Sequence, residues 1–402
     1  MEPAYLTADR PGTGGRLRAR PEDFRVEEIP LYEPAGEGEF VYVRITKRKL
    51  STFEAIRRMA RALQIEERRI SYAGLKDARA VTSQWLCAED VSIDAVRGLR
   101  VAGLTVGEVR RHGNRLKVGH LRGNRFRIVV RNAVPDAVDR AEAVLEVLVR
   151  RGVPNAFGGQ RFGTRRDSHR YGEAMIRRDY EGFLRRFLGN PSELEHDRDL
   201  RRSRELYDQG RVRDAYEAMP TRYRGEKKAL HALLRFGEAE RAFFAVPLRL
   251  RQMFASSFQS SLFNRVLGQR LPDLDRLEPG DLAYLHRNGA VFAVEDAAAE
   301  QPRCDCLEIS PSGPLFGTHA PLAAGGQGER EAAVLAATGL GRDDFAVGGG
   351  VRCKGGRRPL RVPLKDVAME KGRSDGTLVL KFALPAGSFA TTVLGEILKT
   401  EV

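Results

Sequence analysis

The chain has 402 residues, of which 42% are hydrophobic and 30% charged. This length allows two or three domains with sizeable cores, and the composition excludes a disordered chain. Lys and Arg number 68 against 54 Asp and Glu, which gives a formal net charge of +14. Such an excess attracts polyanions and favours nucleic-acid binding, although many Arg-rich proteins simply carry a basic surface.

The cysteine spacing and the absence of long apolar runs bear on metal binding and on cellular location. Cys304 and Cys306 are separated by one residue, too few for the usual zinc spacing, and no His-rich segment follows them. We therefore expect no metal site. Residues 1–15 lack an export signal, and no apolar run is long enough to span a bilayer. We expect a cytoplasmic protein without membrane contact.

The first predicted elements are strands and a capped helix. Residues 16–30 alternate like a strand interrupted by a proline turn, and Phe40–Ile45 alternates with its valines on one face. Ser51 and Glu54 then form a capping box that predicts the start of a helix. Four apolar side chains recur at helical spacing behind this cap and should face a core: Phe53, Ile56, Ala60 and Leu63.

A loop at residues 74–84 is the most informative feature of the chain. It places Asp77 between the cations of Lys76 and Arg79, on a turn flanked by strand-like segments. A loop fixed at both ends by strands can hold a reactive side chain in one geometry. A charged surface turn without a catalytic role would show the same sequence pattern, because Lys-Asp is common in turns.

The next segments combine a cationic strand with a glycine-rich turn. In Arg125–Arg131 the apolar side chains point one way and the arginines the other, so one face could meet phosphates or merely face solvent. An amphipathic helix follows and ends at Gly152. Residues 153–163 then place three glycines beside two phenylalanines and an arginine, which suits base stacking and lacks Walker spacing.

The remainder alternates between a helical region and a return to strands. Residues 175–270 read as largely helical, with Phe258, Leu262 and Val266 on one buried face. A strand from Leu378 to Leu384 precedes a short helix. A sheet domain whose two parts are separated by a helical insert is the economical arrangement.

The side chains exclude several reaction classes. There is no G-x-S-x-G motif and no dinucleotide fingerprint. A lone Asp in a cationic setting, an aromatic face and a basic surface suit chemistry on a nucleobase taken out of its stack. Asp77 would act there as a nucleophile or base, with the aromatic holding the base by stacking.

The chain resembles the TruD family of pseudouridine synthases. The resemblance rests on six segments that keep their order over nearly the whole chain. They are Pro21–Glu27, Ala73–Leu86, Leu121–Phe126, Val153–Gly163, Ser261–Asn264 and Leu384–Leu398.

The resemblance implies an α+β fold. Its catalytic domain would have a mixed, largely antiparallel sheet with flanking helices, interrupted by an inserted α/β domain. The implied limits are 1–175 and 359–402 for the catalytic domain and 176–358 for the insert.

The resemblance also implies roles for individual residues. The catalytic aspartate falls on Asp77, the stacking aromatic on Phe157 and its supporting asparagine on Asn155. A cation that pairs with the aspartate falls on Arg18, where the family usually has lysine. The motifs further mark Lys76 and Arg161 as substrate contacts, and Thr82 and Gln84 as support for the loop.

The implied reaction is the isomerisation of uridine to pseudouridine in RNA, without cofactor, metal or obligate protein partner. The implied target is position 13 in the D-arm of tRNA. A helical stretch at residues 185–245 is longer than compact bacterial members carry, so another RNA stays open as the substrate. A non-catalytic RNA-binding or chaperone protein fits the charge and aromatics equally well. A methyltransferase lacks a plausible cofactor-binding loop.

Overall fold

The computed structural model describes residues 5–372 and 375–400. The chain divides into two compact units. The first unit combines the chain up to Val153 with the chain from Val362 onward, and the second is Pro154–Arg361. The domain limits predicted from the sequence concern the family's domains rather than compact units, so they stay a prediction.

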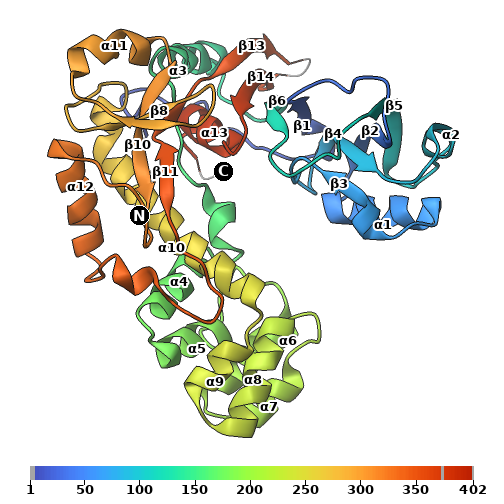
Figure 1. Ribbon diagram of the computed structural model, residues 1–402, viewed down its shortest axis with the longest axis vertical. Coiled ribbons are helices and arrows are strands. Elements are labelled where there is room, and N and C mark those ends of the chain that lie inside the picture. The colour runs from blue at the N-terminus through green and yellow to red at the C-terminus, as the bar shows by residue number, and fades with distance from the viewer. Residues whose placement is uncertain (1–4, 373–374, 401–402) are drawn as a thin grey trace. The chain divides into compact units, whose positions relative to one another are not determined.

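The first unit is built on an eight-stranded sheet (Figure 1). Its order is β13-β14-β6-β1-β4-β2-β5, and β3 also pairs with β4. Strands β1 and β4 run parallel, whereas β1–β6, β6–β14, β13–β14, β2–β4, β2–β5 and β3–β4 pair antiparallel. The predicted mixed, largely antiparallel sheet with strands from both parts of the sequence is therefore confirmed. The strands are β1 (Phe24–Pro30), β2 (Phe40–Arg48), β3 (Ile70–Tyr72), β4 (Val81–Ala88), β5 (Leu104–His112), β6 (Leu121–Val130), β13 (Lys365–Lys371) and β14 (Leu378–Pro385).

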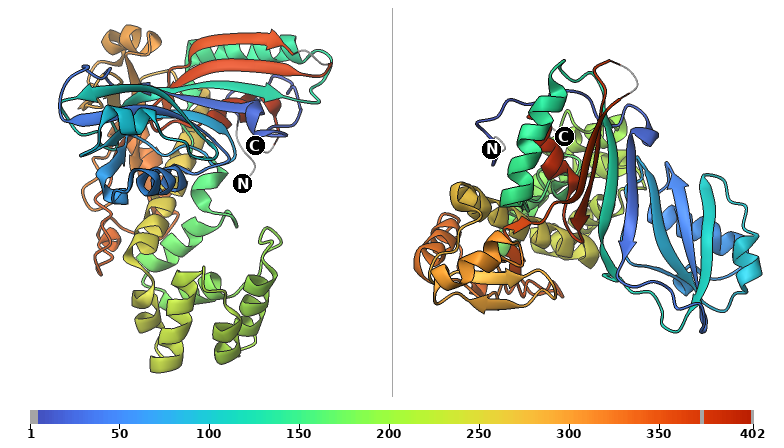
Figure 2. Two further views of the ribbon diagram at one scale, coloured as in Figure 1. Left: turned by 90° about the vertical axis from the view of Figure 1, so that its right-hand side faces the viewer. Right: turned by 90° about the horizontal axis from the view of Figure 1, so that it is seen from above.

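Helices cover this sheet in two groups. Helices α3 and α13 lie together against β6 and β14 (Figure 2), where Ile128, Leu145 and Ile397 share one buried cluster. Helices α1 and α2 cover the other half, where Val43 and Met59 belong to a second cluster. The helical segments of this unit are η1 (Pro21–Asp23), α1 (Thr52–Leu63), η2 (Glu67–Arg69), α2 (Ile93–Arg97), α3 (Ala137–Arg151) and α13 (Ala390–Leu398).

Helix α1 begins as predicted but buries a different face at its first turn. Ser51 Oγ accepts a hydrogen bond from Glu54 N at 3.1 Å, which confirms the N-cap, but the Glu54 carboxylate bonds Arg57 and Arg58 instead of Ser51 N, so the predicted capping box is not formed. Ile56 and Ala60 are buried, but Phe53 is 42% exposed, so its predicted core position was wrong. Thr52 takes the buried place instead, because its hydroxyl bonds the neighbouring loop. Successive helical residues are about 100° apart, so Phe53 is turned toward solvent.

The N-terminal segment, residues 5–18, which we call the arm, is anchored on α13. Glu396 Oε1 accepts from Leu6 N at 2.7 Å, and Oε2 accepts from Thr7 N at 3.0 Å and Thr7 Oγ1 at 2.6 Å. Thr13 N donates to Ile397 O at 2.9 Å. The arm therefore depends on a helix that is remote in sequence.

The second unit combines a helical region with a small sheet. Helices α4–α10 span the region predicted to be helical, and Phe258, Leu262 and Val266 are buried as expected. The sheet has the order β11-β10-β8-β9, with β10 antiparallel to both neighbours. The bounds are η3 (Gly159–Phe162), α4 (Ser168–Ile176), α5 (Tyr180–Leu188), α6 (Arg198–Asp208), α7 (Val212–Ala218), α8 (Arg224–Phe236), α9 (Ala239–Ala245), α10 (Leu248–Arg270), η4 (Leu271–Asp273), β8 (Leu282–Leu285), β9 (Val291–Ala293), α11 (Ala297–Asp305), β10 (Ile309–Leu315), α12 (Gly325–Ala336), η5 (Asp343–Phe345) and β11 (Gly356–Pro359). Short strands β7 (Val153–Pro154) and β12 (Arg361–Val362) stand where the chain enters and leaves this unit.

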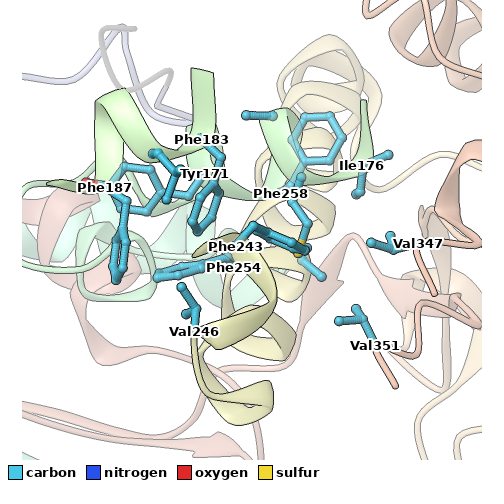
Figure 3. Close-up of a cluster of buried hydrophobic side chains, with 14 of the residues drawn as sticks. Tyr171, Ile176, Phe183, Phe187, Phe243, Val246, Phe254, Phe258, Val347 and Val351 are labelled. Carbon is cyan, nitrogen blue, oxygen red and sulfur yellow. The ribbon is translucent and has the colours of Figure 1, made fainter. Parts of the chain in front are cut away.

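Several aromatic side chains pack against one another in the core of the helical region (Figure 3). Phe183 meets Phe243 edge to face, with ring centroids 5.0 Å apart, and Tyr171 meets Phe254 in the same way at 5.1 Å. Edge-to-face pairs add to the gain from area burial. Within the described residues, no helix combines the length and apolarity that crossing a membrane requires.

Candidate active site

The loop that carries Asp77 connects β3 to β4, as the sequence predicted, and its main chain is held by side chains from outside it. Lys76 N donates to Thr52 Oγ1 at 3.0 Å, and Gln84 Nε2 donates to Gly74 O at 3.1 Å. Thr52 Oγ1 in turn donates to Gln84 Oε1 at 3.0 Å. Helix α1 and strand β4 thus fix the loop through one short hydrogen-bond chain.

Each oxygen of the Asp77 carboxylate has a donor. Arg18 Nη2 lies 2.8 Å from Oδ2, and Arg79 N donates to Oδ1 at 2.8 Å. The side chains of Arg18 and Asp77 are each 26% exposed, so the carboxylate is oriented and still reachable. The predicted pairing of Arg18 with Asp77 is present in this geometry, whereas Arg79 contributes its backbone rather than its charge.

Arg18 is itself held in an unusual place. Its guanidinium carbon lies 4.5 Å above the centre of the Phe24 ring, a cation–π contact. The backbone φ of Arg18 is 56°, which lies in the left-handed region that residues other than glycine rarely adopt. Arg16, two residues earlier, forms an isolated β-bridge with Arg131, the residue that follows β6. The arm and the sheet together therefore present this cation to Asp77.

The ammonium of Lys76 faces the protein interior. Its Nζ lies 2.6 Å from Glu28 Oε2, and the two side chains are 4% and 1% exposed. Glu28 Oε1 also accepts from Trp85 N at 3.1 Å. In this arrangement Lys76 ties the loop to β1. Its predicted contact with substrate stays a prediction.

The two residues predicted to support the loop differ in what they bond. Gln84 bonds both Thr52 and Gly74 and braces the loop directly. Thr82 is fully buried on β4, and its hydroxyl has no hydrogen-bond partner among the described residues. Its role as a support for the loop stays a prediction.

In the second unit, Phe157, the predicted stacking aromatic, is held by hydrogen bonds and ring contacts. Phe157 N donates to Asn264 Oδ1, and Asn264 Nδ2 donates to Phe157 O, both at 2.9 Å. The half-buried Phe157 ring meets Phe263 edge to face at 5.6 Å. Arg358 lies over the ring with its guanidinium carbon 4.3 Å from the centroid, and Arg161 lies at 5.6 Å.

Asn155 and Arg358 hold each other behind this ring. Arg358 Nη2 donates to Asn155 Oδ1 at 2.5 Å, and Asn155 Nδ2 donates to Pro359 O at 2.9 Å. Burial, with a smaller effect of Arg161, lowers the pKa of Arg358 to about 10, so the guanidinium remains charged at pH 7. Asn155 is buried and positions a cation next to the aromatic face in this geometry.

Arg161 is braced from helix α10. Its Nε donates to Ser260 Oγ at 3.1 Å, Nη2 bonds Ser256 Oγ, and its carbonyl accepts from Ser257 Oγ at 3.0 Å. Burial lowers its pKa from the usual value. Arg161 thus belongs to the same cluster as Asn155 and Phe157, and its contact with substrate stays a prediction.

Two arginines of the segment Arg125–Arg131 are paired with carboxylates. Arg125 lies 3.6 Å from Glu27 and 3.4 Å from Asp366. Arg131 forms two hydrogen bonds to Asp23, at 2.7 and 2.9 Å. These pairs support the reading of an ordinary solvated sheet face for Arg125 and of an internal tie for Arg131.

Metal-binding clusters are not found in the part of the chain that the structure describes: no three His, Cys, Asp or Glu side chains are grouped to hold an ion. Cys304 is buried, with Arg361 Nη2 3.0 Å from its sulfur, whereas Cys306 is exposed. The two neighbouring thiols therefore face different surroundings.

Four residues complete these clusters without having been assigned a role from the sequence. They are Glu28, Thr52, Asn264 and Arg358. Asn264 lies in one of the six resembling segments, which is the one signal that could have marked it. Glu28, Thr52 and Arg358 reach the site residues only because the chain folds, from positions 24 to 203 residues away in sequence.

Comparison with known proteins places the chain in a family. Residues 1–397 match the family tRNA pseudouridine synthase D (TruD). The chain is 45% identical over 398 residues to the tRNA pseudouridine synthase D of Geobacter sp. (strain M21), with 99% of both chains covered. It is 47% identical over 399 residues to that of Geobacter metallireducens, with 99% of this chain and 98% of the relative covered. The helical stretch at 185–245 lies within these matches.

A solved structure gives the same result. The crystal structure of a Methanosarcina mazei protein that bears the name tRNA pseudouridine synthase D (TruD) matches with a TM-score of 0.85 and 29% identity, covering 99% of this chain and 96% of that one. The chain therefore belongs to the TruD family of tRNA pseudouridine synthases.

Proposed function

We propose that this protein isomerises uridine to pseudouridine at position 13 in the D-arm of tRNA, with Asp77 as the nucleophile. The observation that supports Asp77 most strongly is its carboxylate, which has a donor on each oxygen and stays partly exposed on a loop braced from β4 and α1. The names of the relatives supply the reaction and the class of substrate.

The chemistry needs no external reactant. The bond between uracil N1 and ribose C1′ breaks, a bond between C5 and C1′ forms, C5 loses its proton, and N1 ends protonated. Atoms are rearranged within one nucleotide, so no oxidant or reductant takes part. Asp77 can attack C1′, attack C6, or assist the departure of uracil, and Arg18 holds one carboxylate oxygen in each case.

Phe157 is proposed to stack on the extruded uracil. Its main chain is clamped by Asn264, and its ring is backed by Phe263 and Arg358, so its position is determined before substrate arrives. Stacking of a base on an aromatic side chain contributes about 1–3 kcal/mol. Asn155 supports this face by holding Arg358.

The substrate is proposed to be tRNA in the cytoplasm. A net charge of +14 gives long-range attraction to an RNA backbone. Phosphate contacts make such binding strongly dependent on salt.

The test uses purified protein and a tRNA transcript tritiated at uridine C5. Release of tritium reports loss of the C5 proton, and sequencing of the modified transcript identifies the position. Asp77→Asn should bind the transcript with the wild-type Kd and release no tritium above background. Asp90→Asn, at an exposed aspartate two residues after β4, serves as the matched control and should react like wild type.

Three outcomes would count against parts of this proposal. Tritium release by Asp77→Asn rules out the nucleophile. Tight binding of tRNA by wild-type protein without any release supports the RNA-binding alternative. Modification of a different uridine, or of another RNA in a total RNA sample, rules out the target position.

A further inference from the structure

A buried lysine from outside the loop bonds the main chain at Asp77. Lys47 lies on β2 and is 0% exposed. Its Nζ lies 2.6 Å from Leu50 O, 3.3 Å from Lys76 O and 2.9 Å from Asp77 O. An ammonium has three donors and no acceptor, so these three carbonyls match its donors in number.

We propose that Lys47 is a positioning residue for the reaction: its ammonium fixes the main chain at Asp77, and so the direction of the carboxylate, without touching substrate. This inference rests on the proposed function, in which that carboxylate acts on the target uridine. Thr52 and Gln84 hold the loop at Lys76 N and Gly74 O. Lys47 instead bonds the carbonyl of Asp77 itself.

The cost of burying this charge argues for a role beyond packing. Moving an ammonium from water into the protein interior costs desolvation free energy. Hydrogen bonds to neutral carbonyls offset less of that cost than a carboxylate partner would. An apolar side chain of the same length would avoid that cost but would leave three buried carbonyls without this donor. The three converging carbonyls, two of them from the loop, explain why a cation occupies this position.

The titration of Lys47 predicts a pH dependence of the reaction rate that a purely packing role would not produce. Burial is the largest influence and lowers the pKa of Lys47 to about 8; Asp77 raises that pKa and Lys76 lowers it. Those two charges are themselves paired with Arg18 and Glu28. A neutral amine has two donors and a lone pair, so loss of the proton leaves one of the three carbonyls without a donor.

The first experiment measures single-turnover tritium release with the full-length enzyme in excess over tRNA. Lys47→Met should slow the step about 100-fold, because a displacement near 1 Å costs that much when reacting groups must be aligned. Its Kd for tRNA should stay at the wild-type value. Lys49→Met, at an exposed lysine two residues further on, is the matched control and should react like wild type.

The second experiment follows the same step from pH 6 to pH 10. The wild-type rate should fall as pH rises through about 8, where Lys47 loses its proton. Lys47→Arg keeps its charge over this range, so its fall should move to higher pH whatever its absolute rate. Ionisation of the substrate would affect both proteins alike.

Two results would overturn the proposal: Lys47→Met reacting at the wild-type rate, or a wild-type rate that is flat up to pH 10. If Lys47→Met fails to fold, the wild-type pH profile decides alone. Failure of the proposed function is distinguishable, because wild-type protein would then form no pseudouridine at any pH.

Discussion

Glu28 and Lys76 form an ion pair that is almost fully withdrawn from solvent, with Nζ and Oε2 2.6 Å apart. The pair joins β1 to the residue that precedes Asp77, and Trp85 N donates to the second oxygen of Glu28. The neighbours Lys76 and Asp77 thus take different partners. Lys76 faces the interior, and Asp77 meets Arg18 in a partly exposed position.

Breaking the Glu28–Lys76 pair should destabilise the first unit. Glu28→Gln leaves the Lys76 ammonium buried without a counter-charge, which costs about 3–5 kcal/mol of unfolding free energy. Urea unfolding measures this change. The control is Glu27→Gln, because Glu27 is 41% exposed and its pairs with Arg44 and Arg125 lie at the surface; it should change stability by less than about 1 kcal/mol. Equal effects of the two changes would contradict the role of burial.

Replacing Arg18 should slow turnover in a graded way. Arg18→Met removes a charge-assisted hydrogen bond worth about 1.5–3 kcal/mol, so the single-turnover rate should fall about 10- to 150-fold. Arg18→Lys keeps the charge but gives up the planar contact with Phe24 and should lie between. Arg25→Met, at an exposed position on β1, should have no effect. A lysine variant as slow as the methionine variant would show that charge is not what matters.

The proposed stacking role of Phe157 can be tested with another phenylalanine that also has arginines beside its ring as the control. Phe157→Ala should slow turnover about 5- to 150-fold, which corresponds to the loss of about 1–3 kcal/mol of stacking. Phe236 is 41% exposed, with Arg235 and Arg241 each 5.0 Å from its ring, and Phe236→Ala should react like wild type. Equal rates for the two variants would remove Phe157 from the reaction.

Asn264 should act through Phe157. Asn264→Ala removes both hydrogen bonds to the Phe157 main chain and should slow turnover while leaving the Kd for tRNA nearly unchanged. In the double variant with Phe157→Ala, the two losses should be less than additive, because the second change has no fixed ring left to displace. Full additivity in single-turnover rates would contradict this coupling.

The stability contribution of Lys47 should rise with pH even as turnover falls. Its pKa is about 8 in the folded protein, against an ordinary value of 10.5, so between these values the unfolded chain binds more protons than the folded one. Wild-type protein should therefore gain up to about 3 kcal/mol relative to Lys47→Met between pH 8 and pH 10.5. Urea unfolding of both proteins at the two pH values measures it. A constant difference would contradict the burial of a titrating amine.

The sequence predicted elements whose cause is local. The cap at Ser51 and the apolar alternation of Phe40–Ile45 are fixed by residues a few positions apart, and the structure confirms both. Phe53 was misplaced because helical spacing alone allows either flank of the stripe at the first turn. Thr52 decided the outcome through a hydrogen bond to Lys76, 24 residues away.

The partners of the site residues depend on contacts that sequence spacing does not reveal. Glu28 and Lys76 are 48 residues apart, and Arg358 reaches Asn155 from 203 residues away. Lys76 and Arg79 flank Asp77 in sequence, but the cation that meets its carboxylate is Arg18, 59 residues earlier. Resemblance to the family, rather than spacing, indicated that pairing.

The anchoring of the arm on α13 sets an order of events during synthesis. A ribosome makes Arg18 early and must complete all of Pro154–Arg361 before it reaches Glu396, which holds the arm. Until that residue emerges from the exit tunnel, Arg18 lacks the anchored arm that presents it to Asp77. Under the role proposed for Arg18, a nascent chain that already contains the Asp77 loop is therefore not yet a complete catalyst, and tRNA modification waits until α13 has been translated.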